Sequence, residues 1–276
     1  MKILPFIAAA ALSVFAPLAH ADRLDDIRQA GELKVATFDG NPPFGFVDTK
    51  THQLEGLDID YAKALAKHLG VKLKLVPTNP ANRMPLLVSG KVDLVAANFT
   101  VSPERAQQVD FSIPYFASGQ QFIVRKGTLT SPELLNRWRV GVDKGTVNEG
   151  VLREKYPKAK VIAYDDTPFA FAALRNGSVQ AITQDGTKLV GLLANVPDRD
   201  DFEVPALTLS NDLIAVGIPK GETTLKKEVD DTLLALEKDG EAQRIYDKWF
   251  GPESRTPLER TYRIGQQAPV NGAATQ

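Results

Sequence analysis

Hydrophobic and polar positions along the chain follow two alternating periods. Short apolar runs recur at 33–37, 71–76, 94–97, 122–124, 139–142 and 179–183, as in strands buried on both faces of a parallel sheet. Between these runs, apolar residues recur at three- and four-residue spacing. In 58–69, for example, Ile59, Ala62 and Ala66 share one helical face and Gly70 follows as a stop. The alternation predicts an α/β fold in which helices cover mostly parallel sheets.

The same patterns place the remaining elements. Helices are expected at 22–30, 58–69, 80–88, after Ser131, from Thr146 to about 155, and at 167–174, 187–194, 225–236 and 241–250. A hairpin-like segment is expected at 48–55, a crossover near 116–120 and a return strand at 214–219. Beyond Pro257 the periodicity fades, which predicts a C-terminal tail whose end, 268–276, is disordered.

The N-terminus has the pattern of a signal peptide. Lys2 precedes an apolar run at 3–18, and the A-x-A sequence 19–21 predicts cleavage after Ala21. A membrane anchor is the alternative, but the run is shorter than the roughly 18 residues that a span needs. The chain has no cysteine, so neither a disulfide framework nor a lipid-anchoring cysteine is available. We therefore expect a soluble monomer in the periplasm.

Composition and net charge argue against one class of function, nucleic-acid binding. The 276 residues are 43% hydrophobic and 24% charged, with a formal net charge of −1. This composition is that of an ordinary globular protein, long enough for two lobes. It carries no basic excess of the kind that nucleic-acid binding requires.

The segment 92–111 carries the clearest candidate chemistry. An apolar strand ends at Asn98 and Thr100, and Ser102 then reads as the N-cap of a helix that begins at Pro103. Arg105 lies in the first turn of that helix. A guanidinium beside free backbone N–H groups makes an anion site that suits a small carboxylate. The alternative is that Arg105 is a surface residue paired with Asp110.

Two further strand ends complete the chemistry. Gly145 lets the backbone approach a ligand, and Thr146 and the helix start after it offer a hydroxyl and free N–H groups. Asp185 ends the strand at 179–183 and would favour a cation, although it could equally cap the helix that follows. A carboxylate and an ammonium on the same carbon make an α-amino acid, so the pairing of these sites predicts an amino-acid ligand.

Several motifs in the right order resemble the periplasmic solute-binding proteins of polar amino-acid ABC importers, the bacterial solute-binding protein family 3. The matching segments are EGLDIDYAKALAKHLG (55–70), SGKVDLVAANFTVSPERAQQVDFSIPYF (89–116), VGVDKGTVNEGVL (140–152), NGSVQAITQD (176–185) and IYDKWFG (245–251). The resemblance covers nearly all of the chain after the signal peptide.

The resemblance implies a two-lobed type II periplasmic-binding-protein fold, with a mostly parallel sheet in each lobe and two hinge crossovers. Lobe 1 would comprise 22–116 and 213–257, lobe 2 would comprise 117–212, and 258–276 would form the tail. Closure of the lobes around the ligand would be the signal read by an inner-membrane ABC permease.

The resemblance also implies roles at matching positions. Four groups would hold the α-carboxylate from the two lobes: Arg105, Thr100, Thr146 and the N–H of Val147. Asp185 would take the ammonium, with help from Thr100 and the carbonyl of Asn98.

Specificity follows from the remaining positions. Arg83 matches an arginine that acidic-amino-acid binders direct at the side-chain carboxylate; alternatively it pairs with a neighbouring acid. The aromatic sandwich of glutamine and basic-amino-acid binders is absent, because Asn41 and Pro80 stand at the matching positions. Four further residues are expected near the pocket: Phe38, Phe44, Asp143 and Gln184. Glutamate or aspartate is the first expected ligand.

Other classes of function find less support. After the signal peptide only His52 and His68 remain, with no cysteine and no metal-ligand spacing, so we expect no cofactor, no metal and no enzymatic activity. The alternative is a cyclohexadienyl (prephenate or arogenate) dehydratase on the same fold, because fold does not decide function. A further alternative is a binder that feeds a chemoreceptor.

Overall fold

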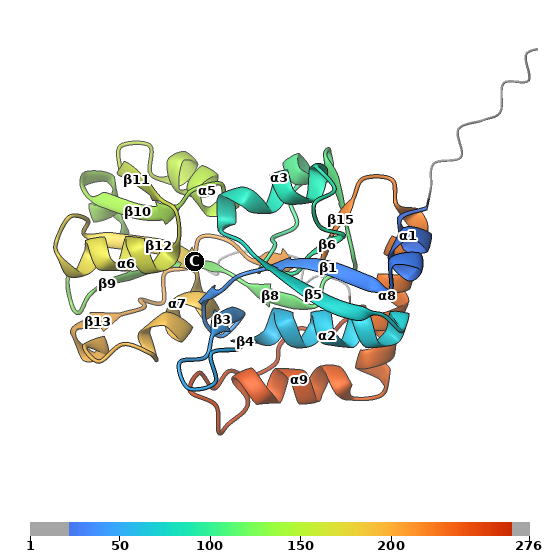
Figure 1. The fold of residues 1–276 in the computed structure, drawn as a ribbon. Helices are drawn as coiled ribbons and strands as arrows, with labels where there is room; N and C mark the ends of the chain where they lie inside the picture. Colours follow the sequence, from blue (N-terminus) through green and yellow to red (C-terminus); the bar gives the residue numbers. More distant parts are fainter. Residues whose placement is uncertain (1–21, 267–276) are drawn as a thin grey trace, which may run out of the picture.

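The computed structural model describes residues 22–266 and contains two five-stranded sheets in these residues, set side by side (Figure 1). The first sheet has the order β5-β1-β6-β15-β7, from β1 (Glu32–Thr37), β5 (Lys72–Pro77), β6 (Leu94–Val95), β7 (Val109–Phe111) and β15 (Gly217–Pro219). The second has the order β11-β10-β12-β9-β13, from β9 (Gln120–Arg125), β10 (Arg139–Asp143), β11 (Lys160–Tyr164), β12 (Ala181–Asp185) and β13 (Phe202–Glu203).

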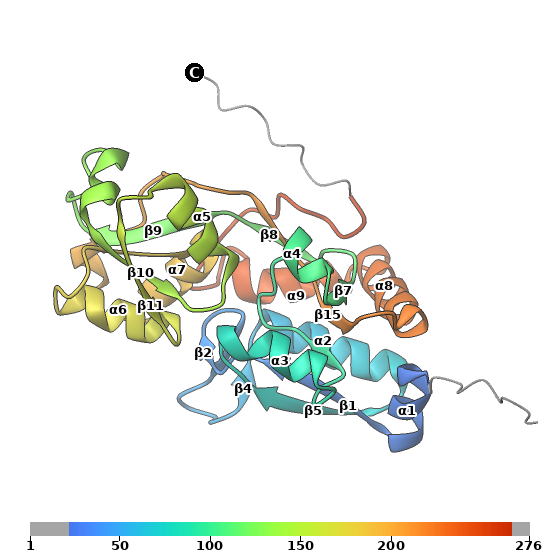
Figure 2. The ribbon, with the colours of Figure 1, turned by 90° about the horizontal axis from the view of Figure 1, so that it is seen from above.

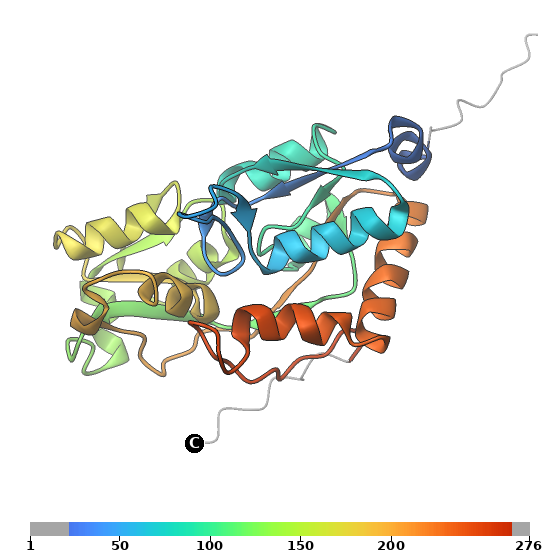
Figure 3. The same ribbon diagram turned by 60° about the horizontal axis from the view of Figure 1, so that its bottom comes forward.

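Each sheet has its own helices. The first sheet is accompanied by α1 (Arg23–Ala30), α2 (Leu57–Leu69), η1 (Pro80–Asn82), α3 (Arg83–Val88), α4 (Pro103–Ala106), α8 (Thr223–Lys238) and α9 (Glu241–Phe250). The second is accompanied by η2 (Pro132–Arg137), α5 (Val147–Lys155), α6 (Thr167–Arg175), α7 (Gly186–Leu193) and η3 (Arg199–Asp201). Figures 2 and 3 show the two groups as separate lobes, with α8 and α9 packed together on the first. Each lobe buries its own apolar clusters, so each has its own core.

Two strands connect the lobes. β8 (Phe116–Ser118) and β14 (Asp212–Ile214) pair antiparallel, and the chain passes through them into and out of the second sheet. A Cβ on Gly119 would lie 2.4 Å from the carbonyl oxygen of Ser210, so the close approach of the two connections requires glycine there. The expected lobe boundaries at 117 and 212 fall inside these two strands, and they stay a prediction.

A small sheet extends from the first lobe toward the second. It consists of β2 (Gly40–Asn41), β3 (Gly45–Val47) and β4 (Leu54–Glu55), in antiparallel pairs. The prolines of the segment 38–46 lie in the turn between β2 and β3. Strand β2 lies beside α6 and α7 of the second lobe, so this segment forms part of the contact between the lobes.

The predicted α/β architecture is confirmed, and some elements differ from expectation. The segment 214–219 is not one strand: Ile214 ends β14, and β15 begins at Gly217 in a different sheet. The helix expected at 80–88 is split into η1 and α3. The helix expected at 167–174 is α6, and Asp166 is its N-cap, because its carboxylate accepts a hydrogen bond from the backbone N–H of Thr167. The predicted signal peptide and the end of the tail lie outside the described residues.

Asp58 in the first turn of α2 fixes the end of β6 from inside the first lobe. Its carboxylate accepts hydrogen bonds from the backbone N–H of Asn98 at 2.7 Å and from the hydroxyl of Tyr115 at 2.5 Å. Complete burial raises the pKa of Asp58 to about 7, although both hydrogen bonds oppose the shift. The proton is therefore bound more tightly in the folded than in the unfolded chain.

This binding predicts a pH dependence of stability. Between about pH 4 and 7 the folded chain holds a proton on Asp58 that the unfolded chain has released, so the free energy of unfolding falls as pH rises. We expect Asp58→Asn to remove this fall, which amounts to at most about 4 kcal/mol. Urea unfolding at pH 4.5 and 7.5 measures it, with the exposed Asp231→Asn as control. Equal pH dependence in wild type and Asp58→Asn would contradict the assignment.

Candidate functional site

Side chains from both lobes enclose a polar cavity between the carboxyl ends of the strands, here called the interlobe cavity. The first lobe contributes Phe38, Pro80, Arg83, Asn98, Thr100 and Arg105. The second contributes Thr146, Asn148, Gln184, Asp185 and Lys188. The volume of the cavity is only about 10 Å³, so the side chains of the two closed lobes nearly fill it, and a ligand enters only when some of them move apart. Ligands of open α/β sheets bind at this end of the strands.

Arg105 is held at one wall of the interlobe cavity. Ser102 caps α4 by accepting a hydrogen bond from the backbone N–H of Arg105, and the guanidinium lies 4.6 Å from the centre of the Phe99 ring. Its Nη1 donates to the carbonyl of Thr100 at 2.9 Å, and its Nη2 donates across the lobes to that of Gly145 at 3.1 Å. Burial lowers the pKa of Arg105 to about 10, so the group stays charged at neutral pH.

The surface alternative for Arg105 is not what the structure contains. Asp110 pairs with Lys220 at 2.8 Å instead. Arg105 is only 8% exposed and lines the interlobe cavity. A charged fork buried at a cavity wall can bind a carboxylate in two-pronged fashion.

Asp185 lies in the opposite lobe, at the end of β12 and the start of α7. It occupies the N-cap position of α7, yet its side chain makes no capping hydrogen bond. Its Oδ2 instead accepts from the Nδ2 of Asn98 at 2.5 Å, across the lobes. Burial, assisted by the charge of Asp212, raises the pKa of Asp185 to about 6. The carboxylate is therefore ionised at pH 7 to 8 in a site that hardly hydrates it.

Buried oxygens without a hydrogen-bond partner gather among the residues that line the cavity. Within residues 22–266 they include Oδ1 of Asp185, Oδ1 of Asn98 and Oδ1 of Asn148. Buried polar atoms in proteins nearly always have a partner. Three acceptors without donors fit a ligand that brings N–H groups, as an ammonium does.

Arg83 has backbone carbonyls as partners rather than an acid. Its Nε donates to Pro80 at 3.1 Å, and its Nη1 donates to Ala97 and Asn98 at 3.0 Å each. The guanidinium lies between the rings of Phe38 and Phe99. Burial and the neighbouring charge of Arg105 lower the pKa of Arg83 to about 9. Arg83 therefore forms a fixed cationic wall of the cavity.

Of the other predicted site residues, some line the cavity and some do not. Phe38, Thr146 and Gln184 line the cavity, whereas Phe44 packs in the core of the first lobe, 5.2 Å from the ring of Phe116. Asp143 is buried behind the lining, and Val147 is the first residue of α5.

Sequence reasoning missed two lining residues, Asn148 and Lys188. Asn148 donates to the side-chain oxygen of Gln184, and Lys188 lies in the first turn of α7. Their signal in the sequence was position alone: each follows a predicted strand-end turn within one helical turn. Neither residue type at that spacing identifies a ligand site by itself.

Direct contacts join the lobes beside the cavity. Asn41 of β2 donates to both carboxylate oxygens of Asp166, at 2.9 and 3.1 Å. On the neighbouring helix, a Cβ at Gly191 would lie 2.5 Å from the carbonyl oxygen of Pro42. The lobes are thus closed on each other in this structure.

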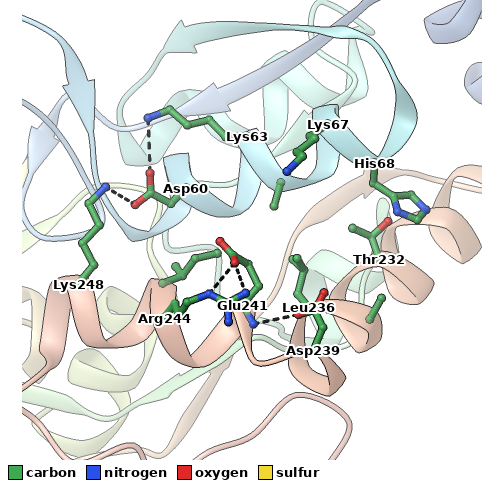
Figure 4. Close-up of a pocket in the computed structure, with 13 residues that line it drawn as sticks. Asp60, Lys63, Lys67, His68, Thr232, Leu236, Asp239, Glu241, Arg244 and Lys248 are labelled. Carbon is green, nitrogen blue, oxygen red and sulfur yellow. Dashed lines mark hydrogen bonds and ion pairs between the residues drawn. The ribbon is translucent and has the colours of Figure 1, made fainter.

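A larger hollow lies between α2, α8 and α9, with a volume of about 760 Å³ (Figure 4). Five of its charged side chains pair with one another. Lys63 and Lys248 both contact Asp60, and Arg244 pairs with Glu241. Exposed pairs of this kind are ordinary on helical surfaces, so we assign the binding chemistry to the smaller interlobe cavity.

The described residues 22–266 contain no group of three or more His, Asp or Glu side chains placed to hold a metal ion. In the same range, none of the helices has the length and apolar content that crossing a membrane requires.

Comparison with known proteins identifies close relatives. The L-cystine-binding protein TcyJ of Escherichia coli is 34% identical over 233 residues, which are 83% of this chain and 86% of TcyJ. The crystal structure of a cysteine-binding protein from Campylobacter jejuni superposes with a TM-score of 0.79 at 35% identity, covering 86% of this chain and 95% of that one. The crystal structure of AncCDT-1 is described as that of an ancestral amino acid-binding protein, a precursor of cyclohexadienyl dehydratase. It superposes with a TM-score of 0.75 at 35% identity, covering 83% of this chain and 100% of that one.

These neighbours share the two-lobed type II periplasmic-binding fold, which confirms the predicted fold class. The family model for bacterial extracellular solute-binding proteins, family 3, matches residues 33–252. The chain belongs to this family of solute-binding proteins.

Proposed function

We propose that the chain is the substrate-binding component of an amino-acid ABC importer and that it binds a polar or acidic L-amino acid in the interlobe cavity. The single observation that carries the proposal is the opposed placement of Arg105 and Asp185 on two lobes of one cavity. A guanidinium on one lobe and a carboxylate on the other match the two charges of an amino-acid zwitterion.

The contacts within each lobe support the assignment of the two ends. Arg105, with Thr100 and Thr146 beside it on the cavity wall, takes the α-carboxylate, and the N–H of Val147 at the start of α5 adds a donor. Asp185 takes the ammonium, together with unpartnered oxygens of Asn98 and Asn148. The ligand then replaces direct interlobe bonds such as that between Asn98 and Asp185.

The ligand couples its binding to closure because its two charged ends are held by different lobes. A ligand that contacts both lobes binds the closed form better and shifts the population toward it. The closed form presents both lobes to an inner-membrane permease in a fixed relation. Export to the periplasm, with cleavage after Ala21, completes the proposal.

The side-chain preference follows from the charges that remain. Arg83 and Lys188 line the cavity, so a neutral polar or acidic side chain is favoured. Glutamate and aspartate are the first ligands to test, beside glutamine and beside cystine, for which TcyJ is named.

Calorimetric titration of the protein, purified after unfolding and refolding to remove carried-over ligand, tests the proposal. We expect at least one amino acid of the panel to bind with micromolar or tighter affinity and to reduce the radius of gyration in small-angle scattering. No binding by any of the twenty common L-amino acids or cystine would refute the function.

A dehydratase on the same fold is the alternative that the neighbour AncCDT-1 keeps in view. Incubation with prephenate and with arogenate, followed by ultraviolet detection of the aromatic product, separates the two. We expect both compounds to be recovered unchanged.

A further inference from the structure

Lys188 is a buried cation that the amino-acid backbone of a ligand does not require. It is 2% exposed, in the first turn of α7, and its Nζ lies 3.0 Å from Oδ2 of Asp143 and 3.9 Å from Oδ1 of Asp166. The same Nζ lies 4.9 Å from the centre of the Phe38 ring in the other lobe. Lysine is rarely buried to this extent unless it is paired.

Lys188 is part of the cavity lining and holds its ammonium against the carboxylate of Asp143. Lys188 lines the interlobe cavity, whereas Asp143 lies behind the lining at 1% exposure. Oδ2 of Asp143 accepts hydrogen bonds from Thr167, Gln184 and Lys188, while its Oδ1 is buried without a partner. Removal of the Lys188 ammonium would therefore leave Asp143 with an unpaired charge toward the cavity.

The charged residues of the cavity wall also disfavour a cationic ligand side chain. Its charged lining residues are Arg83, Arg105, Lys188 and Asp185. Once Arg105 and Asp185 hold the two ends of the zwitterion, the groups left for the ligand side chain are the cations Arg83 and Lys188. Asp166 is engaged by Asn41, so it offers no second carboxylate to a basic side chain.

We propose that Lys188 determines specificity by excluding amino acids with a cationic side chain, and that Asp143 is a masked cation site which Lys188 neutralises. This inference rests on the proposed function and names the class of side chain that its site accepts. Like charges brought together in a desolvated site are strongly unfavourable, so discrimination is achieved by repulsion as well as by contact.

The test is the ratio of the dissociation constants for L-arginine and L-glutamine, measured by calorimetry at pH 7.5. Lys188→Met keeps an unbranched side chain, shorter by one heavy atom, and removes its charge, and we expect it to shift the ratio at least thirtyfold toward arginine. Lys188→Arg, the matched control that keeps the charge, should leave arginine excluded. A Lys188→Met ratio within threefold of wild type would overturn the proposal.

Two further variants separate charge from space. In Lys188→Met with Asp143→Asn the freed carboxylate is gone, so we expect the gain for arginine to be at least tenfold smaller than in Lys188→Met alone. An equal gain would show that space, not Asp143, accounts for it and would overturn the masked site. Asp143→Asn alone should free Lys188 and shift the glutamate-to-glutamine ratio at least fivefold toward glutamate.

The Asp143→Asn measurement also decides the case in which Lys188→Met does not fold, as judged by circular dichroism and thermal melting. An unchanged glutamate-to-glutamine ratio in Asp143→Asn would then overturn the proposal. Titrations of the wild type separate a failure of the proposed function from a failure of the role of Lys188. Absence of any amino-acid binding refutes the proposed function, whereas tight wild-type binding with unchanged ratios in the variants refutes only the role of Lys188.

Discussion

Arg105→Ala is expected to abolish calorimetrically detectable amino-acid binding. Truncation would leave the ligand α-carboxylate buried without its charged partner, at a cost of roughly 3 to 5 kcal/mol. This cost corresponds to a loss of affinity between roughly a hundredfold and several thousandfold. Titration of the variant with the ligand that wild type binds best measures it.

Two controls make the Arg105 result specific. Arg105→Lys keeps the charge but not the planar fork, so we expect it to bind with intermediate affinity. Truncation removes the bonds to the carbonyls of Thr100 and Gly145 but also removes the unfavourable burial of the charge, so the melting temperature of unliganded Arg105→Ala should stay near that of wild type. Affinity of Arg105→Ala within threefold of wild type would refute the α-carboxylate site.

Local sequence signals were sufficient for the helices whose ends carry their own chemistry. Helix α2 was expected at 58–69 and is observed at Leu57–Leu69, because Gly70 adopts the left-handed conformation that stops it. Helix α9 was expected and observed at 241–250, since its strongly one-sided apolar face packs on the first lobe. Ser102 caps α4 as predicted, with Pro103 as its first residue.

Elements defined by long-range pairing were harder to predict. The strand β11 was not expected, although 161–164 is a continuous apolar run; it lies at an edge of the second sheet, and none of its residues is fully buried. The buried part of the segment 212–219 is apolar throughout. Nothing in its sequence marks where β14, which pairs with β8, ends and where β15, which belongs to the first sheet, begins. Sheet membership is decided by partners distant in sequence.

In the candidate site too, positions at strand ends could be predicted from the sequence, whereas long-range contacts could not. Arg105 and Asp185 were predicted because each follows a strand whose carboxyl end faces the cavity, a property of the α/β fold that the sequence reveals. The partners of each could not be predicted. Asn98 reaches Asp185 from 87 positions away, and Arg83 turned out to be held by carbonyls rather than by an acid. Lys188 is held at the cavity by its ion pair with Asp143, a contact that the sequence does not reveal.

Asp185→Asn is expected to have opposite effects on ligand binding and on the stability of the unliganded protein. The amide keeps the shape that bonds Asn98 but loses the charge that holds an ammonium, so affinity should fall at least roughly thirtyfold, since removal of one member of a buried charged pair costs about 2 to 5 kcal/mol. The raised pKa of Asp185, about 6, means that the wild type loses stability as pH rises from about 4 to 6.

We therefore expect the unliganded Asp185→Asn protein to melt above wild type at pH 7.5 and to lose this advantage at pH 4. A cycle with the deamino analogue of the best ligand isolates the ammonium contact: wild type should discriminate strongly between amino acid and analogue, and Asp185→Asn should bind both about equally. Undiminished discrimination in the variant would show that the ammonium is held elsewhere. Because the melting measurement needs no ligand, it tests the buried charge even if the bound metabolite is not an amino acid.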